Sequence, residues 1–136
     1  VTRKITSSVA KIYLGLQDKI ELGNLSAQRD WGFAGDYVKA MWSMMQHDIP
    51  DDYVIATGST NSVSTFLNLA FEEIGIADFS SYVIQNPKYF RKAEVDILKG
   101  DSSKAKNILS WKPETNIQEL VSMMVNADIR RLQTNG

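Results

Sequence analysis

Apolar residues recur every three or four positions in several segments of this chain, which is the spacing of one helix face. The pattern predicts a helix at the N-terminus and further helices over about 34–46, 63–74, 101–111 and 117–132. Polar residues that typically begin helices precede each of them. The expected caps are Thr2 or Thr6, Asp30 or Gly32, Asn61 or Ser62, Asp101, and Asn116.

Short β-prone runs lie between these helices. "KIELG" (19–23) alternates apolar and polar residues, "YVIATG" (53–58) has the continuous apolar character of a buried strand, and "YVIQ" (82–85) precedes a proline. Helices that alternate with short strands predict an α/β fold, built from helices with a few short strands.

Composition narrows the class of protein. The chain has 136 residues, of which 43% are hydrophobic and 23% charged, so we expect a globular protein with a real core. The net charge of −1 argues against a general nucleic-acid binder. No apolar run approaches the roughly 20 residues of a membrane span, and no secretory signal opens the chain, so we expect no membrane partner and a cytoplasmic location. Because the first residue is Val1 rather than methionine, we expect a piece of a longer protein.

Several catalytic motifs are absent from the sequence. It contains no cysteine, no G-x-G-x-x-G, no Walker loop and no Y-x-x-x-K pair. Gly32 and Gly35 are interpreted as a turn, and His47 as a residue near a helix end rather than a catalytic or metal-binding one. No metal site is predicted, and we assign no catalytic residue. We therefore expect the isolated chain to be inactive.

Two clusters of residues suit an anionic ligand. One is the stretch with Arg29, Asp30 and Trp31, which precedes the helix predicted from residue 34. The other is the stretch 86–101, in which three cations surround two aromatic residues. Within it, Arg91 and Glu94 face the same side if they lie on one helical turn. Arginine offers a planar fork to phosphate oxygens, and a carboxylate accepts hydrogen bonds from a ribose diol. The alternative is a surface ion pair beside packed aromatic residues, and residue types alone leave both interpretations open.

Longer blocks of the sequence are more specific. "VTRKIT", "LGNLSAQRDWGFAGDYVKAMW", "YVIATG", "SVSTFLNLAFEEIGI", "PKYFRKAEVDILKGDSSKAKNILSWKP" and "ELVSMMVNAD" follow one another in this order. Together they cover nearly the whole chain, and it resembles the C-terminal part of the GDP-mannose 4,6-dehydratase family of extended short-chain dehydrogenase/reductase enzymes. The resemblance implies that 1–136 is a substrate-binding part, and that a Rossmann-type dinucleotide-binding domain precedes it in the family.

The resemblance also implies an activity. Members of the family convert GDP-D-mannose to GDP-4-dehydro-6-deoxy-D-mannose, the first step towards deoxysugars of the GDP-fucose and GDP-rhamnose type. NADP takes a hydride from the sugar and returns it, and the protein supplies orientation and acid–base groups. The implied partner is GDP-mannose, and the implied assembly is a homodimer or homotetramer.

Five positions match residues that contact the nucleotide in the family. The resemblance places Arg29 at the GDP, Arg91 at the diphosphate, Glu94 at the ribose, Lys4 near the nucleotide and Asn24 near the base. Asp30 and Trp31 are expected to cap and pack the following helix.

Three positions depart from the family pattern. Lys92 replaces a usual proline, Phe33 a histidine and Ser110 a glycine. Lys92 puts the placement of Arg91 in question. Two alternatives to the family remain open at this stage: another nucleotide-sugar epimerase or dehydratase, and a stand-alone, non-enzymatic α/β binding module.

Overall fold

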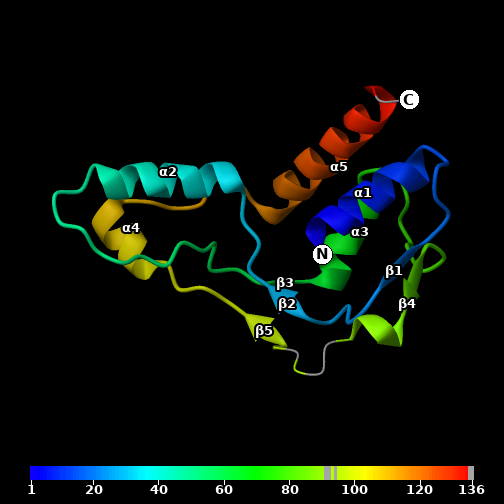
Figure 1. Cartoon of the computed structure of the whole chain (residues 1–136), viewed down its shortest axis with the longest axis horizontal. Coiled ribbons are helices and arrows are strands. Elements are labelled where there is room, and N and C mark those ends of the chain that lie inside the picture. The colour runs from blue at the N-terminus through cyan, green and yellow to red at the C-terminus, as the bar shows by residue number, and fades with distance from the viewer. Residues whose placement is uncertain (91–92, 94, 135–136) are drawn as a thin grey trace.

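Two groups of helices are joined by very short strands (Figure 1). The computed structural model describes residues 1–90, 93 and 95–134. The first group consists of α1 (Thr2–Tyr13), α3 (Val63–Glu72) and α5 (Ile117–Thr134), with β1 (Ile20–Leu22) and β4 (Val83–Gln85) beside them. The second consists of α2 (Ala34–Met45) and α4 (Ser103–Leu109). Between the groups lie β2 (Gln28–Arg29), β3 (Asn61–Ser62) and β5 (Ile97–Leu98), and the 3₁₀ turn η1 (Pro87–Tyr89) follows β4.

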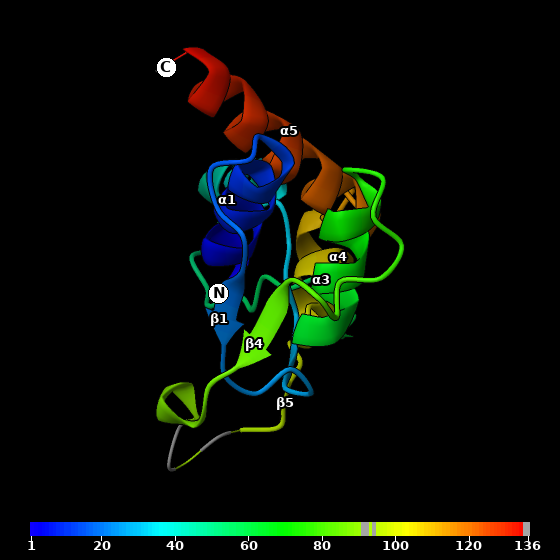
Figure 2. The same cartoon turned by 90° about the vertical axis from the view of Figure 1, so that its right-hand side faces the viewer.

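The main core lies where α5 packs across α1 and α3 (Figure 2). Ile5 and Val9 on α1 and Phe66 and Phe71 on α3 are fully buried, as the helical spacing predicts. Asp128 is buried on α5 beside them. It accepts a hydrogen bond from the Thr6 hydroxyl (2.7 Å) and forms an ion pair with Arg131 (2.8 Å) and a longer one with Arg3 (3.4 Å).

The predicted caps have mixed outcomes. Ser62 caps α3 by accepting a hydrogen bond from the Thr65 backbone N–H (2.9 Å). Asn116 and Glu119 form a reciprocal capping box at the start of α5, so that prediction is also confirmed. The prediction of Thr2 or Thr6 as the cap of α1 was wrong. Val1 occupies the cap position, and the Thr6 hydroxyl is instead drawn into the core by Asp128.

The strands predicted over 19–23 and 82–85 are confirmed and pair with each other. β1 and β4 are parallel, with Ile20 opposite Val83. β2 lies between β3, which is antiparallel to it, and β5, which is parallel. These three strands have two residues each, too few for periodicity to reveal them.

The segment 53–58, predicted as a buried strand, forms no strand. A strand needs a neighbouring strand for its backbone hydrogen bonds, and the described residues place none beside it. Its side chains contribute to a small core instead. Tyr53 and Ile55 pack against the second core cluster, whereas the side chain of Val54 is exposed.

The second helical group is organised by a buried carboxylate. Asp36 accepts hydrogen bonds from the backbone N–H groups of Glu114 (3.0 Å) and Thr115 (2.9 Å), and its own carbonyl accepts one from the Trp111 indole (2.8 Å). Burial acts to raise the pKa of Asp36, but the two backbone donors and the nearby Lys39 outweigh it, so the pKa is lowered. Asp36 is therefore held ionised where it joins α2 to the segment before α5.

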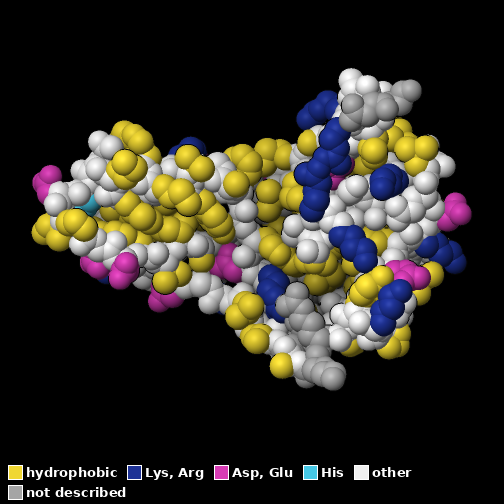
Figure 3. Space-filling view, in the orientation of Figure 1, with side chains coloured by type: hydrophobic (Ala, Val, Ile, Leu, Met, Phe, Trp, Pro, Cys, Tyr) yellow, Lys and Arg dark blue, Asp and Glu magenta, His cyan; other side chains and the backbone are white. Residues whose placement is uncertain are grey.

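Much of the second group is covered by exposed apolar side chains. In the space-filling view, hydrophobic side chains gather over the end of the molecule formed by α2 (Figure 3). We call this the α2 apolar face; its exposed members Val38, Met41, Trp42 and Met45 have the three- and four-residue spacing of one helix face. The apolar side that the helical spacing gives α2 is thus largely exposed, and Met45 is 82% exposed. Among the described residues, no helix combines the length and apolar character needed to cross a bilayer.

Ser110 ends α4 in a left-handed conformation, with φ 54° and ψ 24°. Side chains with a Cβ strain this backbone region, and glycine adopts it without cost. This explains why glycine suits the position better than the serine found here.

We expect Ser110→Gly to raise the free energy of unfolding by about 0.5–1 kcal/mol, because glycine relieves the left-handed strain. Urea denaturation of the purified chain measures the change. Ser43→Gly is the matched control. It lies inside α2 with ordinary helical geometry, so it should lower stability by about 0.5–1 kcal/mol. A loss of stability in both variants would contradict the expectation.

Candidate functional site

A pocket of about 310 Å³ opens at the N-terminal end of α1. Its walls come from α1, the end of β1, β2, the start of α3, and η1. The lining residues are Val1, Lys4, Leu22, Gly23, Asn24, Ala27, Arg29, Val63 and Tyr89. The structure thus brings Lys4 on α1 to the same place as Asn24 and Arg29, which lie beyond β1 in the sequence.

Lys4 extends from the exposed side of α1, while its neighbour Ile5 is buried in the core. The Lys4 ammonium donates a hydrogen bond to the Glu21 carbonyl (2.6 Å) and lies 4.4 Å from the centroid of the Tyr89 ring. These two contacts hold a flexible side chain at the pocket wall.

Arg29 occupies the central strand of the three-stranded sheet, opposite Asn61 on β3 and Leu98 on β5. Its guanidinium donates hydrogen bonds to the carbonyls of Val95 and Gln28, both at 2.7 Å. Neighbouring strands therefore fix the backbone of Arg29, and two carbonyls orient its charged end.

Asn24 lies in the turn that follows β1. Its side-chain oxygen accepts hydrogen bonds from the backbone N–H (2.9 Å) and hydroxyl (2.7 Å) of Ser26, which shapes the turn at the pocket rim. Arg91 and Glu94, the other two predicted contacts, lie outside the described residues.

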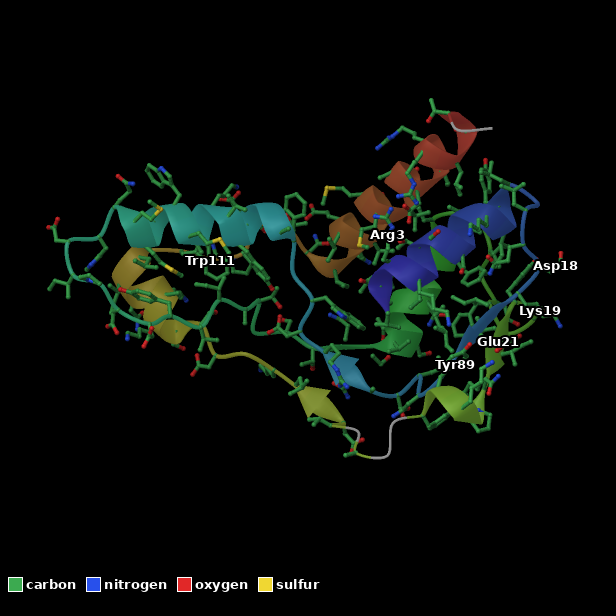
Figure 4. All side chains as sticks on the ribbon, in the orientation of Figure 1. Arg3, Asp18, Lys19, Glu21, Tyr89 and Trp111 are labelled. Atoms are coloured by element: carbon green, nitrogen blue, oxygen red, sulfur yellow. The ribbon has the colours of Figure 1, made fainter. Side chains whose placement is uncertain are left out.

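Tyr89 lines the pocket and was not among the predicted contacts. Figure 4 places it near Glu21, at the end of the molecule formed by β1 and η1. Lys88 lies 4.8 Å from the ring centroid and 3.6 Å from the Glu21 carboxylate. The Tyr89 side chain and, to a smaller extent, the Glu21 carboxylate raise the pKa of Lys88. The sequence signal was the block "PKYFR", where two aromatic residues stand between two cations.

The pocket is chemically suited to binding an anion beside an aromatic group. Two cationic side chains and one tyrosine line it, with no carboxylate or histidine among its described lining residues. Nor does the described part of the chain contain a cluster of side chains that could hold a metal ion. The arrangement therefore favours ligand binding over proton transfer.

The residues just after Arg29 stabilise the structure around the site. Trp31 packs edge-on against Phe66, with ring centroids 5.1 Å apart, which confirms it as a packing residue. The prediction that Asp30 caps the next helix was wrong, because Phe33 occupies that position. The Asp30 carboxylate instead accepts hydrogen bonds from the backbone N–H (2.9 Å) and hydroxyl (2.5 Å) of Thr57 and from the N–H groups of Gly58 (2.9 Å) and Gly100 (3.3 Å).

Close contacts with aromatic rings explain the glycines at positions 32 and 35. A Cβ on Gly32 would collide with the Tyr37 ring, and one on Gly35 would collide with the Phe33 ring. The two glycines make room for these aromatic rings at the start of α2, so they do not form a cradle for phosphate.

The sequence profile of the GDP-mannose 4,6 dehydratase family matches residues 1–124. GDP-mannose 4,6 dehydratase 2 from Arabidopsis thaliana is 54% identical over 129 residues, which are 95% of this chain and 34% of the relative. GDP-mannose 4,6 dehydratase from Homo sapiens is 47% identical over an alignment of 151 residues, covering 99% of this chain and 41% of the relative. The chain thus spans between a third and about two-fifths of these relatives.

Solved structures share the fold at low sequence identity. RMD from Pseudomonas aeruginosa, complexed with NADPH, superposes with a TM-score of 0.85 at 19% identity over 96% of this chain and 42% of its own. UDP-glucose 4-epimerase from Bifidobacterium longum, in complex with NAD+ and UDP, gives a TM-score of 0.75 at 20% identity over 97% and 40%. At this level of identity the likeness shows a common fold.

Asp30→Ala should lower the free energy of unfolding by about 2 kcal/mol, because it leaves partly buried N–H groups of three residues without their acceptor. Urea denaturation measures the change. Asp18→Ala is the control: this exposed aspartate should change stability by less than about 0.5 kcal/mol. Equal effects of the two substitutions would show that Asp30 does not tie these segments together.

Proposed function

The chain belongs to the GDP-mannose 4,6-dehydratase family, and we propose that it forms the part of such an enzyme that binds the nucleotide sugar. The observation that carries this proposal is the meeting of Lys4 and Arg29 at one pocket, within a chain whose residues 1–124 match the family. Both are the type of residue that binds phosphate oxygens, and both are oriented by backbone carbonyls.

The full-length protein would convert GDP-D-mannose to GDP-4-dehydro-6-deoxy-D-mannose with loss of water. In this proposal Arg29 and Arg91 bind the diphosphate, Glu94 binds the ribose, and Asn24 lies near the base. Contacts to the nucleotide, which does not react, hold the hexose in position for the chemistry. Binding energy from a remote part of a substrate can promote reaction at the reacting centre in this way.

A nicotinamide cofactor is expected in the full-length protein. The fold neighbours complexed with NADPH and with NAD+ support a cofactor of this class, and the family resemblance specifies NADP. The residues of this chain do not fit a dinucleotide site: it lacks the glycine fingerprint, and Gly32 and Gly35 are packed against their own neighbours. We therefore assign the cofactor to a separate dinucleotide-binding part and residues 1–136 to the substrate-binding part.

The α2 apolar face supports this division. A helix with an apolar face normally buries it, yet the described residues leave Met41, Trp42 and Met45 exposed. We propose that the dinucleotide-binding part covers this face in the full-length protein. The isolated chain would then lack both the cofactor site and the cover for its apolar surface, and we expect it to be inactive.

Of the alternatives, an epimerase has support only from the fold. The UDP-glucose 4-epimerase from Bifidobacterium longum is 20% identical, whereas the dehydratase relatives from Arabidopsis thaliana and Homo sapiens are 54% and 47% identical. The dehydratase assignment is therefore the better supported one.

Calorimetric titration of the full-length protein should give a dissociation constant for GDP about tenfold or more below that for UDP. Guanine and uracil present different hydrogen-bonding edges, and polar groups that fit one base are left unpaired by the other. A tighter or equal UDP complex would support the epimerase alternative.

Arg91→Ala should weaken GDP binding about thirtyfold in the full-length protein. Charge-assisted hydrogen bonds to phosphate contribute roughly 1.5–3 kcal/mol each, and a loss of about 2 kcal/mol corresponds to this factor. Arg91→Lys should recover part of the affinity, because an ammonium lacks the planar fork.

Titration with GDP and the melting temperatures of both Arg91 variants distinguish this role from a surface ion pair with Glu94. Such a pair would contribute at most about 1 kcal/mol to stability and nothing to GDP affinity. Wild-type affinity in Arg91→Ala would remove the residue from the site.

A further inference from the structure

Tyr89 is in contact with two lysines. The Lys4 and Lys88 ammonium groups lie 4.4 and 4.8 Å from the centroid of its ring, within the distance of a cation–π interaction. Only one of these lysines, Lys4, lines the pocket together with Arg29. The ring therefore provides a link between η1 and a cation at the candidate site.

The position of Tyr89 is itself fixed by β1. A Cβ on Gly23 would lie 2.5 Å from the Tyr89 carbonyl oxygen, so the backbones of these two residues are in close contact. The Tyr89 N–H donates to the Asn86 carbonyl (3.0 Å), and the Asn86 amide donates to the Glu21 carboxylate (2.9 Å). The turn that carries the ring is thus attached to the strand whose Glu21 carbonyl accepts from Lys4 (2.6 Å).

Lys4 needs such a support. A lysine side chain has a flexible four-carbon stem and loses considerable rotamer entropy when it is held in one position. Here the Glu21 carbonyl and the face of Tyr89 hold the ammonium before any ligand arrives. Less ordering then remains to be done on binding, which strengthens the complex.

We infer that Tyr89 is a positioning residue for the nucleotide, and that it acts by holding the Lys4 ammonium at the pocket wall for the anionic part of the ligand. This inference rests on the proposed nucleotide-binding function. It adds a residue that the sequence did not single out and a role that depends on Lys4.

The experiment is a double-mutant cycle on GDP affinity in the full-length protein, measured by calorimetric titration. Lys4→Met should weaken GDP binding about tenfold, and Tyr89→Leu about threefold to fivefold. Tyr89→Phe should retain wild-type affinity, because phenylalanine keeps the ring face. In the Lys4→Met background, Tyr89→Leu should cause no additional loss, because the group it positions is gone.

Lys88→Met is the matched control. It removes the other cation at the ring but no residue that lines the pocket, so GDP affinity should stay within about twofold of wild type. A large loss in this variant would overturn the inference in favour of action through Lys88. Melting temperatures report on folding, and Tyr89→Met, which keeps a large apolar side chain, replaces Tyr89→Leu if the latter does not fold.

The outcomes separate this inference from the proposed function. Absence of GDP binding by the wild-type protein would overturn the proposed function itself. Normal GDP binding by the wild type with unchanged affinity in Tyr89→Leu or in Lys4→Met would overturn only the positioning role. Losses that add up in the double variant would also overturn it, because they indicate independent effects.

Discussion

The Asp30 carboxylate joins the segments on which the candidate site depends. It follows Arg29 directly and accepts hydrogen bonds from Thr57, Gly58 and Gly100, which belong to two separate loops. Backbone N–H groups in such loops need an acceptor when they are removed from water, and one carboxylate supplies it for all of them. The link fixes the end of β2, and with it the position of Arg29, between the two helical groups.

The cations of the pocket are held in place before a ligand is present. The Glu21 and Val95 carbonyls accept hydrogen bonds from Lys4 and Arg29 respectively, and each acceptor belongs to a different segment from its donor. A side chain that is already ordered loses less entropy when it binds a ligand. The two cations are therefore held by acceptors distant in the sequence, which explains how a helix and a strand from different parts of the chain present two charges in a defined place.

Several apolar side chains of α2 are exposed, whereas those of the core around α1 are buried. The core residues of α1, α3 and α5 cover one another, whereas α2 packs on one side against α4 and the segments around Tyr53 and Trp111 and leaves its other apolar side chains exposed. Its exposed methionines and Trp42 fit our proposal that a second part of a longer protein packs there. The irregular segment 53–58 lies in the same group, where Tyr53 and Ile55 pack against its small core.

The sequence by itself determined the features that depend on neighbours along the chain. Helical spacing gave the helices, and local polar residues gave the caps Ser62 and Asn116, because a cap binds an N–H only two or three residues away. Residue type singled out Arg29, and the resemblance to the family supplied Lys4 and Asn24, which periodicity does not distinguish from ordinary surface residues. Only the tertiary structure decided the hydrogen-bond partners of Thr6 and Asp30 and the conformation of the segment 53–58. The two side chains bind partners far along the chain. A β-prone run forms a strand only beside another strand. Tyr89 was missed for the same reason: the block "PKYFR" shows an aromatic beside cations, but its contact with Lys4 joins η1 to α1 and only the tertiary structure reveals it.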